Sequence, residues 1–189
     1  AAVYGNSDHL PLSEEGSTKP INQYGKAKLE AEALLLPYEK SHGMISTCLR
    51  FFNVYGPRQD PSSPYSGVIS IFAARCSTGR PVTVHGDGHQ TRDFIFIKDI
   101  ARAVVASATN TTLPGGIYNL CSGAGITLRE LLSTLKTIHP DIPEPLFKEK
   151  RQGDVRHSLG DPSSARKILG FSVTTSFAEG IRNLQTSNQ

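Results

Sequence analysis

The chain has 189 residues and a formal net charge of +3, with 38% hydrophobic and 20% charged residues. This length and balance are those of one ordinary globular domain and exclude a disordered or low-complexity protein. No lysine and arginine cluster with interleaved aromatic residues is present, and no apolar run approaches the roughly 20 residues of a membrane span, so we expect no nucleic acid partner and no membrane segment.

The chain opens with an apolar run at residues 1–5, which predicts the end of a buried strand. Because a lone strand cannot form a sheet, we expect the chain to be the C-terminal part of a longer protein. A loop over 10–22 leads to a predicted helix over 23–42, which Gly43 ends. Pro37 falls inside this helix and should kink it, because proline lacks a backbone N–H.

The middle of the chain begins with a predicted buried strand over 45–51 and a loop over 53–64. The loop is rich in glycine, proline, aspartate and serine, and long loops of this kind are usually functional. A helix over 68–78 and two strands, over 81–84 and 94–97, are predicted next.

The last part of the chain continues the alternation with an apolar helix over 98–107 and a short strand over 117–120. Thr127 and Glu130 have the spacing of a capping box, which predicts a helix to about residue 138. Two further helices are predicted, one from the cap at Asp161 to residue 168 and one over 176–183. Strands that alternate with helices predict an α/β fold.

Three cysteines, Cys48, Cys76 and Cys121, lie far apart in the sequence, each within or beside an apolar run. They show neither a CxxC pair nor the Cys/His spacing of a metal site, so we predict no metal. Buried free thiols are typical of a reducing compartment. The start of the chain has no signal-peptide pattern. We therefore expect a cytoplasmic protein.

Tyr24 and Lys28 stand four residues apart at the start of the predicted helix, a spacing that places both side chains on one face. An ammonium near a phenol stabilises the phenolate, so Tyr24 could act as a general base. Lys28 could also donate hydrogen bonds to a sugar hydroxyl. A YxxxK pattern by itself is weak, because it also occurs on solvated helix faces.

Four motifs in a fixed order carry a resemblance to a known family. They are AAVYG at 1–5, YxxxK at 24–28, LRFFNVYGPR at 49–58 and GDGxxTRDF at 86–94. Over almost its whole length, the chain resembles the NAD-dependent sugar epimerase/dehydratase family of extended short-chain dehydrogenases/reductases.

The resemblance implies an α/β fold made of the C-terminal part of an extended Rossmann-type, doubly wound sheet plus a small α/β substrate-binding domain. Residues 1–58 would be the remainder of the NAD-binding domain. Residues 59–189 would be mainly the nucleotide-sugar domain, with return segments to the sheet near 82–120. The family's catalytic Ser or Thr would lie just before residue 1, and no GxxGxxG occurs in these residues. We therefore expect this chain alone to bind NAD poorly and to be inactive.

The family's roles transfer to matching positions of this chain. Tyr24 would be the catalytic base, and Lys28 would support it and bind the nicotinamide ribose. Both residues, with Phe52 and Val54, would contact NAD, while Asn53 would reach the phosphate or sugar of the substrate. For Phe52 the alternative is a core aromatic at a strand end.

The family's substrate contacts also transfer. A planar guanidinium can hold two phosphate oxygens, so Arg92 is suited to the diphosphate. The resemblance gives Arg151 the same role, although RxGD as bare sequence is merely a turn. Asp154 would accept hydrogen bonds from the ribose hydroxyls. For Arg92 the alternative is a structural salt bridge to its neighbour Asp93.

Further substrate contacts follow from the resemblance alone. Ser158 would occupy a gate beside the sugar's C2 substituent, where a small residue leaves room for an N-acetyl group. Three predicted contacts to the substrate lie at the end of the long loop: Tyr65, Ser66 and Gly67. Thr83, on the strand over 81–84, and His85, just after it, would contact the uracil.

The function implied is NAD-dependent C4 epimerisation of a UDP-hexose through a transient 4-keto sugar, with the N-acetyl forms as further substrates. A homodimer through the Tyr24 helix is also implied. One alternative is a nucleotide-sugar 4,6-dehydratase or decarboxylase of the same family, which would need an extra acidic pair before residue 1. Another is a non-catalytic fragment that binds nucleotide-sugars.

Overall fold

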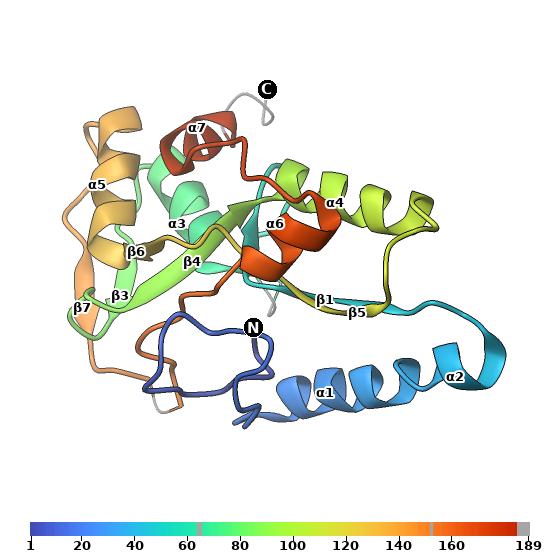
Figure 1. Ribbon diagram of the computed structural model, residues 1–189. Coiled ribbons are helices and arrows are strands. Elements are labelled where there is room, and N and C mark those ends of the chain that lie inside the picture. The colour runs from blue at the N-terminus through green and yellow to red at the C-terminus, as the bar shows by residue number, and fades with distance from the viewer. Residues whose placement is uncertain (64–65, 152, 185–189) are drawn as a thin grey trace.

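The structure is a computed structural model that describes residues 1–63, 66–151 and 153–184. Helices alternate with short, mostly parallel strands, which confirms the predicted α/β fold (Figure 1). In the described part of the chain, no helix is both long and apolar enough to cross a membrane. All three cysteines are buried free thiols.

The helix predicted over 23–42 is two helices, α1 (Gln23–Leu35) and α2 (Tyr38–His42). The break falls at Pro37, because the proline ring and its missing N–H interrupt the hydrogen-bond ladder. At the other end, the side chain of Asn22 accepts a hydrogen bond from the Gly25 N–H at 2.8 Å and caps α1.

Residues 1–5 form a turn rather than the predicted strand. The Tyr4 N–H donates to the Ala1 carbonyl at 3.1 Å, and Gly5 has a φ of +67°. That left-handed backbone bends the chain away from an extended path. Val3 and Tyr4 are nevertheless buried, as expected for the apolar run.

Two parallel strand pairs meet at Phe52. β1 (Thr47–Phe51) pairs with β5 (Gly116–Leu120), and β2 (Asn53–Tyr55) pairs with β4 (Thr91–Phe96). The Phe52 N–H still donates to the Leu120 carbonyl at 3.1 Å, so the extended chain changes partner at this residue. The prediction that the loop begins at residue 53 is therefore wrong by three residues.

Besides β2, sequence patterns missed two described strands. They are β6 (Gly125–Thr127), antiparallel to β4, and β7 (Leu146–Lys148), parallel to β3 (Thr83–His85). Each is only three residues long, which is too short for a two-residue alternation to stand out. β4 starts three residues earlier than predicted, so Arg92 lies on a strand.

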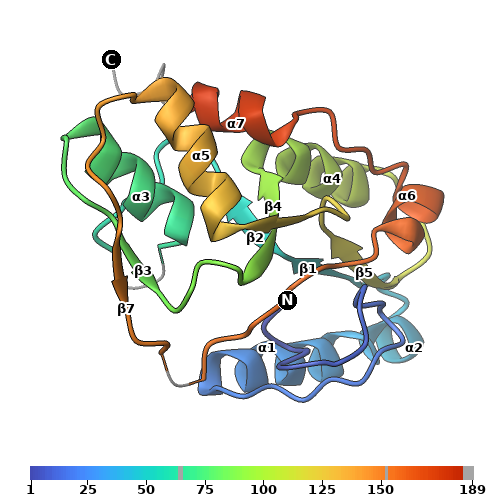
Figure 2. The same cartoon turned by 90° about the vertical axis from the view of Figure 1, so that its left-hand side faces the viewer.

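The remaining helices follow the predictions closely. α3 (Val68–Ser77), α5 (Leu128–Ile138) and α7 (Phe177–Asn183) lie together, whereas α4 (Ile97–Thr109) and α6 (Ser163–Leu169) form a second group (Figure 2). The predicted capping box at the start of α5 is present.

The central strand β4 is buried on both faces. Phe94 and Phe96 point into a core cluster shared with α3, α5 and α7, while Ile95 points into a second cluster with α4 and α6. This alternation follows from the two-residue period of a strand. α1 and α2 lie on the opposite side of the β1–β5 pair from α4 (Figure 1).

Residues 153–161, here called the strap, run from the β7 side of the molecule back toward α6 (Figure 2). The Thr91 N–H donates to the Arg156 carbonyl, and the Ser158 N–H donates to the Thr91 carbonyl, both at 3.1 Å. Farther along, the Asp161 N–H donates to the Leu12 carbonyl at 2.9 Å. The strap is thus tied to β4 and to the N-terminal loop.

Candidate functional site

A cleft of about 570 Å³ lies between the start of α1, the junction of β1 and β2, β4, the start of α3 and the strap. It opens at the carboxyl end of β1, which is where open α/β sheets usually bind ligands. Its volume falls in the usual range for small-molecule sites. The predicted site residues that line it are Tyr24, Phe52, Asn53, Val54, Gly67, Arg92, Asp154 and Ser158.

The other predicted site residues lie outside the described lining of the cleft. Ser66 donates to the Asp60 carbonyl, and a ring nitrogen of His85 lies 3.2 Å from the Glu149 carbonyl oxygen. Tyr65 falls outside the described residues. The remaining members of this group are Lys28, Thr83 and Arg151.

Tyr24 stands in the first turn of α1 and lines the cleft, with 55% of its surface exposed. The Lys28 ammonium lies 5.5 Å from the centre of the Tyr24 ring, so the two side chains share one face of the helix as the spacing predicted. The contact is a cation above a ring face. The cationic group therefore lies beside Tyr24, although Lys28 itself is outside the cleft lining.

A buried ion pair anchors α1 to the sheet. The Arg50 guanidinium donates from Nε and Nη2 to the two carboxylate oxygens of Glu32, at 2.9 and 2.7 Å. Its Nη1 donates to the Tyr4 hydroxyl at 2.8 Å, and that hydroxyl donates to the Asn119 side chain at 2.7 Å. Because β1, β5 and α1 all contribute, this network fixes the helix that carries Tyr24.

Close packing places the first turn of α1. A Cβ on Gly25 would lie 2.5 Å from the Ala2 carbonyl oxygen and 2.9 Å from Pro20 Cβ. Only a glycine allows the helix to approach this closely. The glycine inside the YxxxK motif thus contributes to the position of Tyr24.

Phe52 is both a core residue and part of the cleft wall. It is 6% exposed and packs with Tyr4 and Cys121, as the core alternative for this residue predicted, yet it also lines the cleft. A Cβ on Gly160 of the strap would lie 2.5 Å from Phe52 Cζ and 2.6 Å from the Cys121 sulfur. The strap therefore packs directly against the Phe52 ring and fixes its position.

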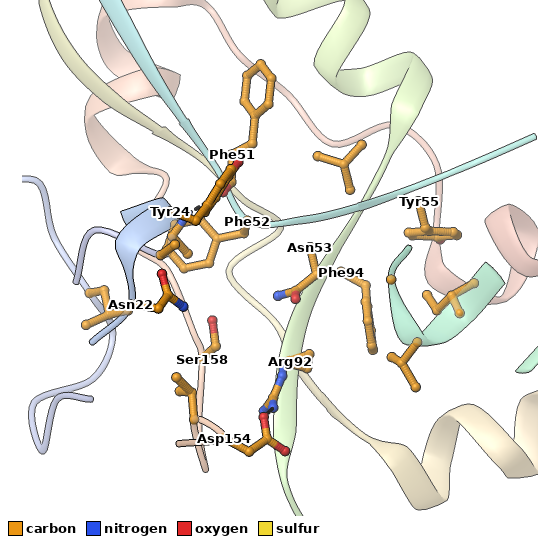
Figure 3. Close-up of a pocket in the computed structure, with 18 of the residues that line it drawn as sticks. Asn22, Tyr24, Phe51, Phe52, Asn53, Tyr55, Arg92, Phe94, Asp154 and Ser158 are labelled. Carbon is orange, nitrogen blue, oxygen red and sulfur yellow. Dashed lines mark hydrogen bonds and ion pairs between the residues drawn. The ribbon is translucent and has the colours of Figure 1, made fainter. Parts of the chain in front are cut away.

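Arg92 forms an ion pair with Asp154, not with Asp93. Arg92 Nη2 lies 2.7 Å from Asp154 Oδ1, and burial lowers the pKa of the Arg92 guanidinium. Figure 3 shows this pair at one end of the cleft, with Tyr24 and Phe52 toward the other. The cleft thus has a phenol at one end and a guanidinium–carboxylate pair at the other.

Asp93 faces the opposite way and holds three segments together. Its carboxylate accepts from the backbone N–H groups of Ser122 at 2.7 Å, Gly123 at 3.0 Å and Gly160 at 3.2 Å, and from the Ser122 hydroxyl at 2.7 Å. The predicted alternative of an Arg92–Asp93 salt bridge is wrong, because successive strand side chains point to opposite faces. Burial raises the pKa of the Asp93 carboxyl.

Ser158 is buried and lines the cleft, between Asn22 and Asp154 in Figure 3. Asn53 also lines the cleft, and its side-chain amide donates to the Asp93 carbonyl at 3.0 Å. That hydrogen bond orients the Asn53 side chain at the junction of β2 and β4.

Other residues that line the cleft were not predicted from the sequence, among them Asn22, Gln59 and Val155. Asn22 has a recognisable signal, because asparagine before a helix is a frequent cap. Gln59 has none. Its buried Oε1 lacks a hydrogen-bond partner among the described residues.

The model of the NAD dependent epimerase/dehydratase family matches residues 1–121. A relative from Mycolicibacterium smegmatis, named UDP-glucose 4-epimerase, is 34% identical over 95% of this chain and 57% of its own length. A relative from Arabidopsis thaliana, named UDP-glucuronic acid decarboxylase 1, is 31% identical over 95% of this chain and 41% of its own. The chain thus spans about half the length of these two relatives.

Two solved structures share the fold of this chain. The UDP-glucose 4-epimerase of Thermotoga maritima, solved with UDP-glucose, superposes with a TM-score of 0.93 at 35% identity, over 99% of this chain and 60% of that one. The UDP-N-acetylglucosamine 4-epimerase of Methanobrevibacter ruminantium M1, in complex with UDP-N-acetylmuramic acid, gives 0.93 at 34% identity, over 100% and 60%.

Proposed function

We propose, because the chain belongs to the NAD-dependent epimerase/dehydratase family, that it forms the proton-transfer and substrate-binding part of a UDP-hexose 4-epimerase. The observation that carries the proposal is the placement of Tyr24 and Arg92 in one cleft. A phenol can exchange a proton with a sugar hydroxyl, and a guanidinium can hold a diphosphate.

At the Tyr24 end, the phenol would accept the proton of the sugar's 4-hydroxyl and later return it. The Lys28 ammonium above the ring would favour the negative charge that forms on the oxygen. The hydrogen bonds of Arg50 and Glu32 hold α1 in place, so the phenol need not be repositioned during the reaction.

The residues around Tyr24 fit the nicotinamide and ribose end of NAD. Phe52 and Val54 supply an apolar wall beside the phenol, and Lys28 offers donors to ribose hydroxyls. NAD, when bound, would take up a hydride from C4 of the sugar and give it back. These 189 residues contain no GxxGxxG loop for the cofactor's pyrophosphate, so this chain would hold only one end of the molecule.

At the other end, Arg92 would bind the diphosphate and Asp154 the ribose hydroxyls. Arg151, two residues before the strap, would add a second cation. Thr83 and His85, on β3, would contact the uracil, since β3 pairs with the strand that leads to the strap. Firm binding of the nucleotide would leave the sugar free to rotate, so that either face of C4 can point toward the nicotinamide. Inversion at C4 requires this rotation. Tyr65, Ser66, Gly67 and Asn53 would complete the contacts to the substrate.

Two experiments test the proposal, the first of UDP binding and the second of activity. In calorimetry, the 189-residue chain should bind UDP, and Arg92→Gln should weaken that binding about tenfold or more, because the diphosphate loses a charge-assisted partner. Undetectable UDP binding would contradict the substrate assignment.

The activity is tested in a polypeptide extended at the N-terminus to the length of the relatives. With UDP-glucose and NAD, nuclear magnetic resonance should show inversion at C4. Tyr24→Phe should reduce the rate at least a hundredfold, because the general base is lost, with the affinity for UDP unchanged. Near-normal turnover by Tyr24→Phe would remove Tyr24 as the base.

A decarboxylase or dehydratase remains the second candidate, because the similar Arabidopsis thaliana protein carries a decarboxylase name. The assay, repeated with UDP-glucuronic acid beside UDP-glucose, separates the reactions by product. A decarboxylase releases carbon dioxide from the uronic acid, whereas a dehydratase yields a deoxy sugar from UDP-glucose. A fragment that only binds nucleotide-sugars would bind UDP, ignore NAD and leave every sugar unchanged.

We further propose that residues 1–58 belong to the NAD-binding unit and residues 59–189 mainly to the substrate unit, within a cytoplasmic homodimer. Leu34 and Leu35 on α1 are 71% and 46% exposed, which supports burial of that helix between two copies. Sedimentation of the extended polypeptide tests the dimer, and Leu34→Glu should produce monomers.

A further inference from the structure

The ion pair inside the cleft joins two segments that are far apart in the sequence. Arg92 lies on β4 and Asp154 on the strap, with 15% and 33% of their side chains exposed. Both line the cleft. A ligand that approaches Arg92 therefore meets a carboxylate already bonded to it.

Backbone carbonyls hold the guanidinium of Arg92 in place independently of Asp154. Its Nη1 donates to the carbonyl oxygens of Thr91 at 2.9 Å and Arg156 at 3.4 Å, while Nη2 donates to Asp154. An anion could thus take the place of the Asp154 carboxylate at Nη2 without moving the arginine. The carboxylate and a phosphate oxygen are both anionic acceptors, so they compete for that donor.

Asp154 can leave Arg92 without releasing the strap, because other contacts fix the strap nearby. The Arg156 guanidinium binds both carboxylate oxygens of Asp87 at 2.9 Å. The Thr91 hydroxyl lies 2.9 Å from a ring nitrogen of His157. Gly153, just before Asp154, has a φ of +77°, and a Cβ added there would meet no heavy atom within 4 Å. A rotation of the Asp154 side chain would turn the carboxylate away from Arg92.

We propose that Arg92 and Asp154 form an exchangeable internal ion pair that selects nucleoside diphosphates over simple anions. A simple anion must displace the Asp154 carboxylate and leave it without a partner. A nucleoside diphosphate displaces it as well, but its ribose hydroxyls then donate to the freed carboxylate. The inference rests on the proposed function, and it makes Asp154 a discriminating residue as well as a ribose contact.

The test compares Asp154→Asn with Asp87→Asn in the 189-residue chain. Both variants remove one negative charge and break one ion pair between the strap and the β3–β4 region, but Asp87 is not among the described residues that line the cleft. The dissociation constants of pyrophosphate and UDP are measured by calorimetry at fixed ionic strength. Melting curves verify that each variant folds, and Asp154→Ser serves as the second variant.

For Asp154→Asn we expect pyrophosphate to bind about fivefold more tightly, because a competing unit charge is removed from a partly solvated site. The affinity for UDP also rises because the competing charge is gone, but it falls because the ribose hydroxyls lose a charged acceptor. The ratio of UDP affinity to pyrophosphate affinity should therefore fall about tenfold. Asp87→Asn should leave that ratio unchanged.

Other outcomes overturn the inference in distinguishable ways. If the two affinities fall together or stay constant in Asp154→Asn and Asp154→Ser, the ion pair has no selective role, and the proposed UDP site still stands. An equal change in Asp87→Asn would show a general charge effect. A wild-type chain that does not bind UDP removes both the inference and the proposed substrate.

Discussion

At the scale of single residues, Arg92 and Asp93 are neighbours that serve opposite sides of β4. Arg92 reaches into the cleft, whereas Asp93 accepts four hydrogen bonds beneath it. The charge of Asp93 thus stays out of the cleft and would not repel an anion bound there. Two consecutive positions of β4 thus have different roles: Arg92 offers a cation to a ligand, and Asp93 binds the backbone of the strap.

Ser158 gives a prediction about substrate size. Its side chain is buried at the cleft wall, so Ser158→Tyr should fill space beside the sugar. In the extended polypeptide, we expect turnover of UDP-N-acetylglucosamine to fall at least tenfold relative to UDP-glucose, because the N-acetyl group is the bulkier substituent. Parallel kinetics on both sugars measure this. An equal loss on both would mean that Ser158 does not contact the C2 substituent.

At the scale of elements, the long helices could be predicted from sequence, whereas three of the four three-residue strands, β2, β6 and β7, could not. The helix starting at Thr127 has a local cause, since its cap and its apolar spacing lie within one segment. β7 forms only because β3, more than 60 residues earlier in the chain, pairs with it. The same reasoning separates the site residues: YxxxK is a local pattern, while the partner of Arg92 depends on the path of the strap.

The capping box of α5 gives a prediction about pH. Hydrogen bonds from the Thr127 backbone and hydroxyl lower the pKa of Glu130 below its usual 4.5. Its carboxylate therefore stabilises the folded state above that value, and the contribution is lost as the pH falls through the lowered pKa. Glu130→Gln should lower the melting temperature slightly at pH 7 and by less at pH 3.

Thermal melts of both proteins at the two pH values measure this difference. Glu144→Gln is the matched control, since Glu144 forms an exposed ion pair with Lys136 outside the cap. A deficit in Glu130→Gln that grew at pH 3 would contradict the capping explanation.

At the scale of the whole molecule, β4 joins the two core clusters. Because Ile95 and Phe96 are adjacent and fully buried in different clusters, one cluster cannot lose its packing without disturbing the other. The 189 residues should therefore unfold in a single cooperative step.

Urea unfolding followed by far-ultraviolet circular dichroism and by tyrosine fluorescence should give coincident transitions. Ile95→Ala should shift both curves together, by about 2 to 5 kcal/mol of unfolding free energy, because it leaves a cavity in a buried site. Two separated transitions would show that the clusters unfold independently.

The change of partner at Phe52 has one more consequence. The hollow at the end of β1 is created by backbone pairing, where one extended segment leaves β5 and joins β4. The side chains on its rim take no part in that pairing. Substitutions on the rim can therefore change which ligand fits, one position at a time, without altering the backbone pairing that forms the hollow.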